Sequence, residues 1–325
     1  MWSFYPKNGS FVGQNPCNCY NAVMEIGRFA PTTSGRAHPG TLLAGLLAWL
    51  DARSHGGRFV LRLEDIDPSA QAADLKQGLL DDLVWFGLTW DRLVWQSESK
   101  QKHEEALDVL AASGLLYECH CSRTKVKAAG LPSTAGGWVY PGTCRGQRVK
   151  DWRDRRQNLR VDLSDWVVEL TDESGLALGQ EVARSMGDPV VRRADGGVTY
   201  QLAVVVDDAD EGVTRVVRGH DLASSTATQV ALHHLLGFPV PRYRHHLLLL
   251  EPQGDKLAKL HQSIGADVLK RHLEPDELRG FLAHACGLRE APGRISFDDL
   301  LEGFRWDRVA TADRIVTWDG HSLGL

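Results

Sequence analysis

The order of apolar and polar segments along the chain predicts an α/β protein. Short apolar runs at residues 26–30 and 59–63 have the length of buried strands. Residues 42–53 between them are apolar on nearly every side and contain no proline, which predicts a buried helix. Gly56 and Gly57 then end this helix in the manner typical of glycine. The alternation of strand, helix and strand indicates parallel strands in one open sheet.

The remaining apolar positions predict further elements of the same kinds. Leucines recur at helical spacing over residues 74–86, and a second amphipathic pattern covers residues 102–113. Further elements are expected as strands at 213–217 and 247–250, as a helix that begins at Ser224, Ser225 or Thr226 and ends at Leu236, and as a helix over 276–286.

Residues 188–208 predict a β-hairpin. Residues 190–193 would pair with residues 199–202 across a turn at Asp195-Gly196-Gly197. The run at 202–206 is continuously apolar, as expected of a strand that is buried on both faces. We therefore expect the acidic pair that follows, Asp207-Asp208, at the end of a strand.

Composition sets broad limits on the class of protein. The chain has 325 residues, enough for two domains or one elaborated domain, with 43% apolar and 24% charged residues. Its net charge is −5, so contact with nucleic acid would need a local basic face. No apolar run has the length of a bilayer, and the first residues lack the pattern of a secretion signal. We expect a cytoplasmic protein without a membrane anchor.

The segment between the first strand and the first helix is the strongest candidate for a ligand loop. Its apolar entry breaks at Pro31, and it ends in His38-Pro39-Gly40-Thr41, where Thr41 is the expected N-cap. A helix N-terminus presents unpaired N–H groups that favour phosphate. His38 is placed to donate to a phosphate oxygen, although a single histidine before a helix is more often structural.

Two other loops carry groups of charge after expected strands. Glu64, Asp65 and Asp67 follow the second strand, where open α/β sheets place ligand contacts, although a solvated acidic turn has the same pattern. Lys256 and Lys259 lie on a glycine-containing loop after residue 250, where they would neutralise phosphate or form a solvated hairpin tip.

Residues 145–160 form a basic run that contains Trp152. Such a run is usually a solvated face. The tryptophan leaves open a contact with a phosphate backbone that includes stacking.

The cysteines suggest a metal site. They occur as two Cys-x-Cys pairs, at 17/19 and 119/121, and as Cys144 and Cys286, a pattern that in a cytosolic protein favours metal over disulfides. Cys119, Cys121 and Cys144 fall in one loop-rich segment, with His120 or Tyr140 available as a fourth zinc ligand. The alternative is three reduced cysteines in an irregular insertion. Residues 1–23 are expected to be a loosely ordered extension before a start at Met24.

Five motifs in order resemble the class I aminoacyl-tRNA synthetases, and specifically their glutamyl branch. The first two look like the HIGH region and the exit of a strand, the next two like the second half of the nucleotide fold, and the last like the KMSKS loop. They are Arg28-Phe-Ala-Pro-Thr with His38-Pro-Gly-Thr, Leu61-Arg-Leu-Glu-Asp-Ile-Asp-Pro68, Tyr200-Gln-Leu-Ala-Val-Val-Val-Asp-Asp, Val217-Arg-Gly-His-Asp221 and Lys256-Leu-Ala-Lys-Leu260. The resemblance implies a Rossmann-like doubly wound nucleotide-binding fold with a zinc-containing insertion and a short helical C-terminal region.

Within this branch, the chain resembles the family of glutamyl-Q tRNA(Asp) synthetases. It continues for too few residues after Leu260 to hold the further anticodon-binding domain of a full glutamyl-tRNA synthetase. The resemblance implies activation of L-glutamate with ATP, accompanied by Mg²⁺, and transfer of glutamate to the queuosine base of tRNA(Asp). It also implies structural zinc, with Tyr140 rather than His120 as the fourth ligand.

The resemblance implies specific site residues. Glutamate contacts fall on Arg28, Phe29, Ala30, Pro31, Thr32, Glu64, Tyr200 and Arg218. ATP contacts fall on His38, Gly40, Thr41, Lys256 and Lys259, of which His38, Gly40 and Lys259 would be catalytic. Zinc ligands fall on Cys119, Cys121, Tyr140 and Cys144. The chain departs from the family pattern at Thr32-Thr33, at Pro39 and at Ala258.

We expect a monomer whose chain divides into five segments. The extension covers 1–23, the first half of the catalytic domain 24–114 and the zinc insertion 115–187. The second half of the catalytic domain covers 188–255, and the lysine loop with the helical C-terminal region covers 256–325.

Three alternative functions stay open. These are a truncated glutamyl-tRNA synthetase that charges a tRNA 3′ end, a small-molecule nucleotidyltransferase and a catalytically inactive RNA-binding module.

Overall fold

The computed structural model describes residues 24–325, apart from residues 71, 134–136, 256 and 258–263. The helices are α1 (Pro39–Ser54), α2 (Ala73–Phe86), α3 (Lys100–Ala112), α4 (Arg123–Ala129), α5 (Val182–Ser185), α6 (Tyr200–Asp210), α7 (Thr226–Leu236), α8 (Ala266–Leu269), α9 (Pro275–Ala285) and α10 (Phe297–Glu302). The longer strands are β1 (Ile26–Phe29), β2 (Arg58–Leu63), β3 (Arg92–Trp95), β4 (Leu116–Cys119), β5 (Asn158–Val161), β8 (Val190–Arg192), β9 (Arg215–Gly219) and β10 (Arg242–His246). Two-residue strands are β6 (Val167–Val168), β7 (Gln180–Glu181), β11 (Leu249–Leu250), β12 (Arg314–Ile315), β13 (Thr317–Trp318) and β14 (Leu323–Gly324), and short 3-10 turns are η1 (Pro68–Ala70), η2 (Gln96–Ser99), η3 (His220–Ser225) and η4 (Trp306–Arg308).

In the described part of the chain, the central sheet has five parallel strands in the order β10-β9-β1-β2-β3. The chain moves from β1 to β2 and β3 on one side, and later to β9 and β10 on the other. The order therefore reverses next to β1. Ligands of open α/β sheets bind outside the carboxyl ends of the strands at such a reversal. The doubly wound fold expected from the sequence is confirmed.

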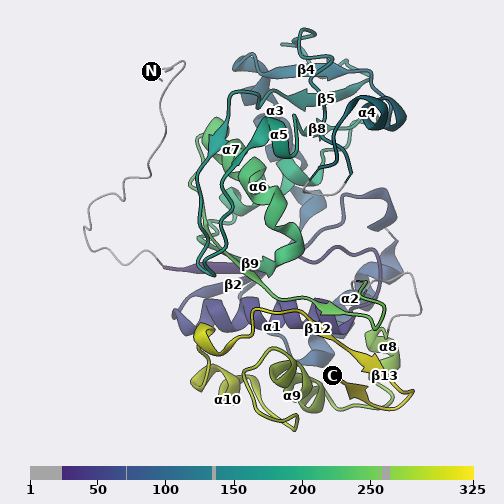
Figure 1. Ribbon diagram of the computed structural model, residues 1–325, viewed down its shortest axis with the longest axis vertical. Coiled ribbons are helices and arrows are strands. Elements are labelled where there is room, and N and C mark those ends of the chain that lie inside the picture. The colour runs from purple at the N-terminus through teal and green to yellow at the C-terminus, as the bar shows by residue number, and fades with distance from the viewer. Residues whose placement is uncertain (1–23, 71, 134–136, 256, 258–263) are drawn as a thin grey trace.

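Helices cover both faces of this sheet (Figure 1). Helix α1 lies between the sheet and the C-terminal helices α9 and α10, and most of its residues are buried. Helices α3, α6 and α7 pack on the other face. Burial from two sides explains why α1 is apolar on nearly every side rather than amphipathic.

The insertion between α3 and α6 forms a second, antiparallel sheet of order β4-β5-β8 at the far end of the molecule from α10 (Figure 1). Its pair β6-β7 reaches back to the central sheet. There the backbone N–H of Glu173 donates to the carbonyl of Tyr243 in β10 at 2.9 Å. The insertion is thus tied directly to an edge strand of the nucleotide fold.

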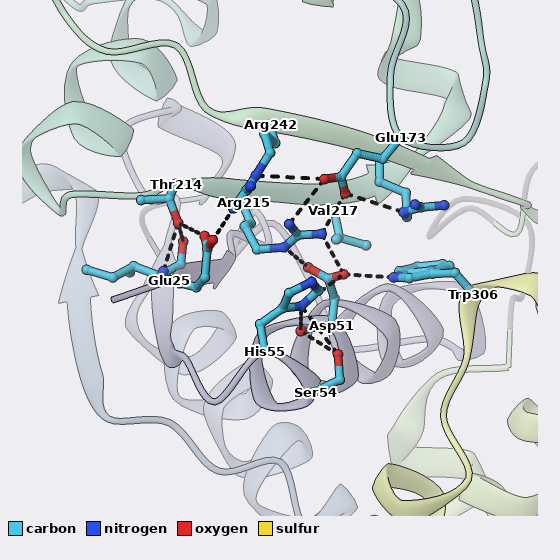
Figure 2. A network of polar contacts seen from close by, with 12 residues as sticks. Glu25, Asp51, Ser54, His55, Glu173, Thr214, Arg215, Val217, Arg242 and Trp306 are labelled. Atoms are coloured by element: carbon cyan, nitrogen blue, oxygen red, sulfur yellow. Dashed lines mark hydrogen bonds and ion pairs between the residues drawn. The ribbon is translucent and has the colours of Figure 1, made fainter. Parts of the chain in front are cut away.

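A polar network at the amino ends of β9 and β10 joins four parts of the chain (Figure 2). Arg215 of β9 donates to both carboxylate oxygens of Asp51 in α1, at 2.6 and 3.0 Å, and also binds Glu173 of the insertion. The indole N–H of Trp306 donates to Asp51 at 2.7 Å. Since this end of the sheet lies opposite the carboxyl ends, the network holds the fold together away from the ligand edge.

The structure corrects the predicted hairpin. β8 is a strand, but residues 200–210 form helix α6, with Leu202–Val206 buried on all sides. A short, fully apolar run cannot be assigned to strand or helix by periodicity alone. The run is buried because α6 packs against α3 and α7, so its apolar residues do not need to alternate.

The first helix also begins earlier than predicted. His38 is its N-cap, and its Nδ1 accepts the N–H of Thr41 at 3.3 Å, so Thr41 is not the cap. Pro39 takes the first helical position. There its missing N–H costs nothing, because the first N–H groups of a helix have no partner within the helix. The departure at Pro39 is therefore compatible with the local geometry.

One strand of the central sheet was missed. β10 reads Arg-Tyr-Arg-His-His, which lacks an apolar pattern, whereas the predicted strand at 247–250 is only the two-residue β11 in a separate pair with β12. β10 lies at an edge of the sheet. Its polar side chains find partners there in the insertion and before β1.

No helix within the described ranges has the length and apolar character that a membrane crossing requires.

Candidate active site

A cavity of about 640 Å³ opens at the carboxyl ends of β1, β2, β9 and β10. All the described residues that the sequence assigned to glutamate or ATP line it. These are Arg28, Phe29, Ala30, Pro31, Thr32, His38, Gly40, Thr41, Glu64, Tyr200 and Arg218. Lys256 and Lys259 lie outside the described residues, but Leu257 between them lines the same cavity.

The N-terminus of α1 forms one wall of the cavity. Because Nδ1 of His38 accepts from the backbone of Thr41, the ring proton belongs on Nε2, which becomes a donor. A Cβ on Gly40 would lie 3.1 Å from the His38 ring. Glycine at this position therefore leaves the imidazole its place and lets a ligand approach the backbone.

The loop before α1 is held by two buried polar groups. Thr33 is fully buried and its hydroxyl donates to the carbonyl of Ala70 at 2.6 Å. Asp82 of α2 accepts from the backbone of Ala37 at 3.1 Å and from Arg36. Thr33, a departure from the family pattern, thus has a defined structural role.

A second wall is rich in carboxylates. Arg28 donates to Asp208 at 3.3 Å and to the carbonyl of Val217 at 3.4 Å. Arg62, fully buried in β2, binds Asp208 and Glu211, each at 2.8 Å. Asp208 and Glu211 come from α6, so the position of this helix determines where the two guanidiniums lie.

Glu64 is the member of this group that faces the cavity. Its Oε1 is buried without a hydrogen-bond partner among the described residues and lies 3.8 Å from the Arg62 guanidinium. Burial raises the pKa of Glu64 to about 7, although Arg62 and Arg28 act to lower it. Burial also opposes the ionisation of Asp208, but Arg28 and Arg62 outweigh it and lower the pKa of Asp208. A cationic group beside Glu64 would supply the missing partner.

The third wall is Arg218 at the end of β9, with four neutral side-chain partners and the carbonyl of Leu222 at 3.4 Å. Its guanidinium donates to Gln229 and Thr226, each at 2.8 Å, and to Tyr200 at 3.4 Å. Its Nε donates to Nε2 of His245 at 3.2 Å. Among the described residues no carboxylate lies within ion-pair distance of Arg218, so its positive charge is available to a ligand.

His245 is itself fixed by the insertion. Its Nδ1 donates to Asp172 at 2.8 Å, and its backbone N–H donates to the same carboxylate oxygen at 2.8 Å. Burial, together with the charge of Arg218, lowers the pKa of His245 to about 4, against the opposing effect of Asp172. The ring is therefore neutral at physiological pH and its Nε2 accepts from Arg218.

The three cysteines predicted to bind metal come together. The sulfurs of Cys119, Cys121 and Cys144 lie within 4.8 Å of one another, and those of Cys121 and Cys144 are 3.7 Å apart. Sulfurs bound to one tetrahedral zinc ion at about 2.3 Å would lie about 3.8 Å apart. The hydroxyl of Tyr140 is 3.5 Å from the Cys119 sulfur, whereas His120 is exposed and lies outside the group. The three thiolates and the phenol oxygen fit a closed metal site.

The basic run at 145–160 is mostly structural. Trp152 is buried and its indole N–H donates to Asp108 at 2.8 Å, so the alternative that the sequence left open, stacking of this side chain on a nucleic acid, does not fit the structure. Most of the arginines pair within the protein. The pairs are Arg145 with Asp188, Arg148 with Asp162, Arg153 with Asp108 and Arg155 with Glu118, while Arg160 lies over the ring of Tyr140.

Sequence reasoning missed the residues that hold the site in place. Arg62 is a charge among the buried apolar residues of β2, and Asp207 and Asp208 lie in the last turn of α6, with Glu211 as its C-cap. Charges at buried positions of this kind are rarely left without a role, and this was the available signal. For Asp172 and His245 no local signal exists, because they are far apart in the chain.

The fold and the site define a class. The family described as tRNA synthetases class I (E and Q), catalytic domain, matches residues 26–294. The relative from Symbiobacterium thermophilum is 41% identical over 306 residues, covering 88% of this chain and 94% of its own, and is named glutamyl-Q tRNA(Asp) synthetase. A relative of the same name from Neisseria meningitidis serogroup B is 41% identical over 299 residues, covering 90% and 99%. The chain belongs to the glutamyl-Q tRNA(Asp) synthetase family within this class.

Solved structures support the fold. A glutamate tRNA ligase from Elizabethkingia meningosepticum, crystallised with its amino acid, superposes with a TM-score of 0.74 at 20% identity, covering 91% of this chain and 68% of its own. A glutamate-tRNA synthetase from Elizabethkingia anophelis gives a TM-score of 0.75, also at 20% identity, over 92% and 69%. Both share the architecture of the central sheet and of the elements around it.

Proposed function

We propose that this protein activates L-glutamate with ATP and transfers the glutamyl group to the queuosine base of tRNA(Asp). One observation carries the proposal. A single cavity joins Arg218, which has no carboxylate partner in the described part of the chain, to a carboxylate-rich wall at Glu64 and to the N-terminus of α1. These three features match the side-chain carboxylate of glutamate, its ammonium group and the phosphates of ATP.

The site residues take the roles that the family resemblance implies. Arg218, with Tyr200 beside it, holds the side-chain carboxylate of glutamate through its guanidinium fork. Glu64 accepts from the ammonium group. Arg28 lies between the two and, with residues 29–32, forms the floor on which the α-carboxylate is directed towards ATP.

Activation is then an in-line displacement. An oxygen of the glutamate α-carboxylate attacks the α-phosphorus of ATP, the bond to the β-phosphate oxygen breaks, and glutamyl-adenylate and pyrophosphate form. Nε2 of His38 and the N-terminus of α1 would stabilise the charge on the phosphates, together with Lys256 and Lys259 from the loop outside the described residues. Mg²⁺ would enter with ATP as part of the substrate.

Transfer follows on the same surface. A hydroxyl of the acceptor base attacks the carbonyl carbon of the adenylate, AMP leaves, and the hydroxyl proton is lost to solvent or to the departing phosphate. The protein contributes position more than covalent chemistry, since the first step needs attack in line with the leaving pyrophosphate and the second needs the hydroxyl held above the carbonyl plane.

We propose zinc for the cysteine site, held by Cys119, Cys121, Cys144 and Tyr140. Three sulfurs and one oxygen would close the coordination sphere, which is typical of a structural ion. Arg160 lies with its guanidinium carbon 3.8 Å from the centre of the Tyr140 ring, a cation–π contact that fixes the ring beside the three sulfurs. Metal analysis of the purified protein, compared with Cys144→Ser, tests this site. A metal-free protein that melts like the variant would reject it.

The decisive experiment combines two assays. ATP–pyrophosphate exchange across the amino acids should depend on glutamate, and labelled glutamate should appear in tRNA(Asp) that contains queuosine. Transfer to tRNA(Glu), or to tRNA(Asp) without queuosine, would favour a truncated glutamyl-tRNA synthetase instead. Release of a small product without tRNA would favour a nucleotidyltransferase, and no exchange with any amino acid would favour an inactive RNA-binding module.

We further propose that the protein works as a monomer in the cytoplasm and that its segments divide at residues 114, 187 and 255. Limited proteolysis tests the boundary at 187, because β8 follows it and pairs with β5. A fragment that holds β4, β5 and β8 together would move this boundary beyond β8. Light scattering of the purified protein tests the monomer.

A further inference from the structure

A second cavity, of about 530 Å³, adjoins the first on the side of the insertion. The two share three lining residues, Ile66, Gln96 and Val198. The second cavity is bounded by η2 and the start of α3 on one side and by the turn at 195–197 on the other. It is a route from the surface of the insertion to the place where glutamyl-adenylate would form.

Most charges around this second cavity are neutralised within the protein. Asp65 binds Lys76 at 2.5 Å, Arg153 binds Asp108 at 2.6 Å, and Asp195 binds Arg193 at 3.2 Å. These pairs leave little free charge in the walls. A polyanion entering here would meet a positive charge only where a cation lacks such a partner.

Arg192 of β8 is that cation. It is 5% exposed, one of its terminal nitrogens donates to the carbonyl of Arg155 at 3.2 Å, and its Nε is buried without a partner among the described residues. In the described structure no carboxylate is within ion-pair distance of it. Its guanidinium carbon lies 5.5 Å from the centre of the Trp152 ring.

Burying this charge is costly without an anion. Burial, and then the nearby charge of Arg156, lower the pKa of Arg192, and the more distant carboxylates of Asp195 and Glu104 offset this only in part. A guanidinium remains charged despite such a shift, so the unfavourable energy stays in the folded protein. A bound anion would offset it with charge-assisted hydrogen bonds, and a guanidinium fork suits phosphate.

We propose that the second cavity seats a backbone phosphate of the acceptor RNA on Arg192, beside the nucleotide that receives glutamate. This rests on the proposed function, because it supposes that an RNA hydroxyl must reach the first cavity. RNA is the polyanion that must pass between surface and adenylate, and phosphate contacts set the register of a nucleic acid without reading its sequence. Trp152 acts through Arg192, whose guanidinium it flanks, and does not stack on a base.

The test is tRNA(Asp) binding to the full-length protein over a range of salt concentrations. Loss of one phosphate contact in Arg192→Gln should weaken binding about tenfold and reduce the slope of log K against log salt by about 0.7 to 0.9. Arg192→Lys should restore most of the slope, because it keeps the charge. Arg294→Gln is the matched control, since Arg294 is an exposed arginine in the C-terminal region, paired with Glu277.

A second pair of variants leaves the core intact. Lys100, the first residue of α3, lies on the rim of the second cavity, is 83% exposed and forms a long ion pair with Glu104 at 3.9 Å. Lys100→Glu should therefore weaken tRNA binding more than Arg294→Glu does. The proposal would be overturned if Lys100→Glu and Arg294→Glu weakened tRNA binding equally. It would also be overturned if a folded Arg192→Gln protein kept the salt dependence of the wild type.

A separate readout distinguishes the RNA from ATP. If the anion were a phosphate of ATP, Arg192→Gln would raise the KM for ATP in pyrophosphate exchange and leave the tRNA slope unchanged. That result would overturn the assignment to RNA. Failure of the wild type to exchange glutamate would instead reject the proposed function, and the tRNA slopes would still report on Arg192.

Discussion

Two arginines face the same cavity in opposite electrostatic surroundings. Arg28 lies 3.3 Å from Asp208, in a group where Arg28 and Arg62 meet the carboxylates of Glu64, Asp208 and Glu211. Arg218, across the cavity, is surrounded by neutral acceptors, among them Gln229 and His245. The side chains differ little, but their neighbours decide what charge each offers to a ligand.

The difference makes the cavity electrostatically asymmetric. On the Arg28 side carboxylates outnumber guanidiniums, so this side attracts a cation. On the Arg218 side one positive charge is held in place by hydrogen bonds that do not neutralise it, so this side attracts a carboxylate. Glutamate carries both groups, and the comparison predicts its orientation, with the ammonium towards Glu64 and the side chain towards Arg218.

The largest effect is expected from removing the charge of Arg218. Arg218→Gln should lower kcat/KM for glutamate in pyrophosphate exchange by about 10²- to 10³-fold, because the substrate carboxylate would lose a fully charged donor. Arg218→Lys keeps the charge but cannot satisfy the same four acceptors, and it should recover only part of the loss. A loss below fivefold would contradict the assignment of the substrate carboxylate to Arg218.

Glu64→Gln should raise the KM for glutamate by about 10- to 100-fold, the scale of one hydrogen bond to a charged group. The effect should fall on glutamate and leave the KM for ATP nearly unchanged. The matched control is Glu302→Gln, an exposed carboxylate in α10 that lies far from the cavity. A shift in the KM for ATP alone would contradict the assignment of Glu64 to glutamate.

The KM for glutamate should rise about tenfold as the pH falls from 8 to 6, because a Glu64 carboxyl with a pKa of about 7 loses its negative charge in this interval. The ammonium group of glutamate stays protonated over the same range, so the change reports on the protein. In Glu64→Gln the profile should be flat between these pH values. If the KM for glutamate still rose at low pH in Glu64→Gln, a different titrating group would be responsible.

Asp172→Asn should lower kcat/KM for glutamate by about tenfold, since it removes the charge-assisted bond that fixes the His245 ring and, through it, Arg218. Asp172 touches no substrate, so it acts by position. If it were merely structural, the variant would melt earlier without a change in the KM for glutamate. A recovered KM in the double variant Asp172→Asn with His245→Gln would confirm the route through the ring.

The last prediction concerns stability rather than catalysis, on the carboxylate side. Burial lowers the pKa of His233, which faces Asp208, to about 4. A histidine whose folded pKa is below its unfolded value destabilises the protein as the pH falls from about 6.5 to 4, because the unfolded chain binds the proton more readily. At pH 5 this loss should be about 2 kcal/mol, and His233→Phe should remove it.

Denaturant melts at pH 7.5 and pH 5 measure that difference. Glu64 and Glu211, whose pKa values burial raises to about 7, act in the opposite direction, so the variant must be compared with the wild type at each pH. His321→Gln, at an exposed position near the C-terminus, should follow the wild type.

Much of the fold followed from local pattern. The strands β1 and β2, the helices α1, α2, α3 and α9, and the glycine ends of α1 and α7 were predicted within a few residues. Errors occurred where pattern was ambiguous or absent. The apolar run of α6 fits a buried strand equally well, and the polar β10 has the composition of a loop, because its partners come from distant segments.

The site residues, like the elements of the fold, were predictable from the sequence only where the signal was local. The sequence identified Arg28, His38 and Glu64 as site residues, because each belongs to a short local motif that matches a family. Lys256 and Lys259 remain predictions, since they lie outside the described residues. Asp172, His245 and Arg62 were missed, because each acts through a residue that is distant in the sequence.

The amino-acid sequence by itself determined the reaction class, the order of the elements and the residues that carry charge to the ligand. These depend on short segments, whose spacing is set by the backbone. Only the tertiary structure decided which charges are neutralised. Arg28, Arg192 and Arg218 look alike along the chain. Within the described residues, the fold gives a carboxylate partner to Arg28 and none to Arg192 or Arg218, since ion pairs form between side chains that packing brings together.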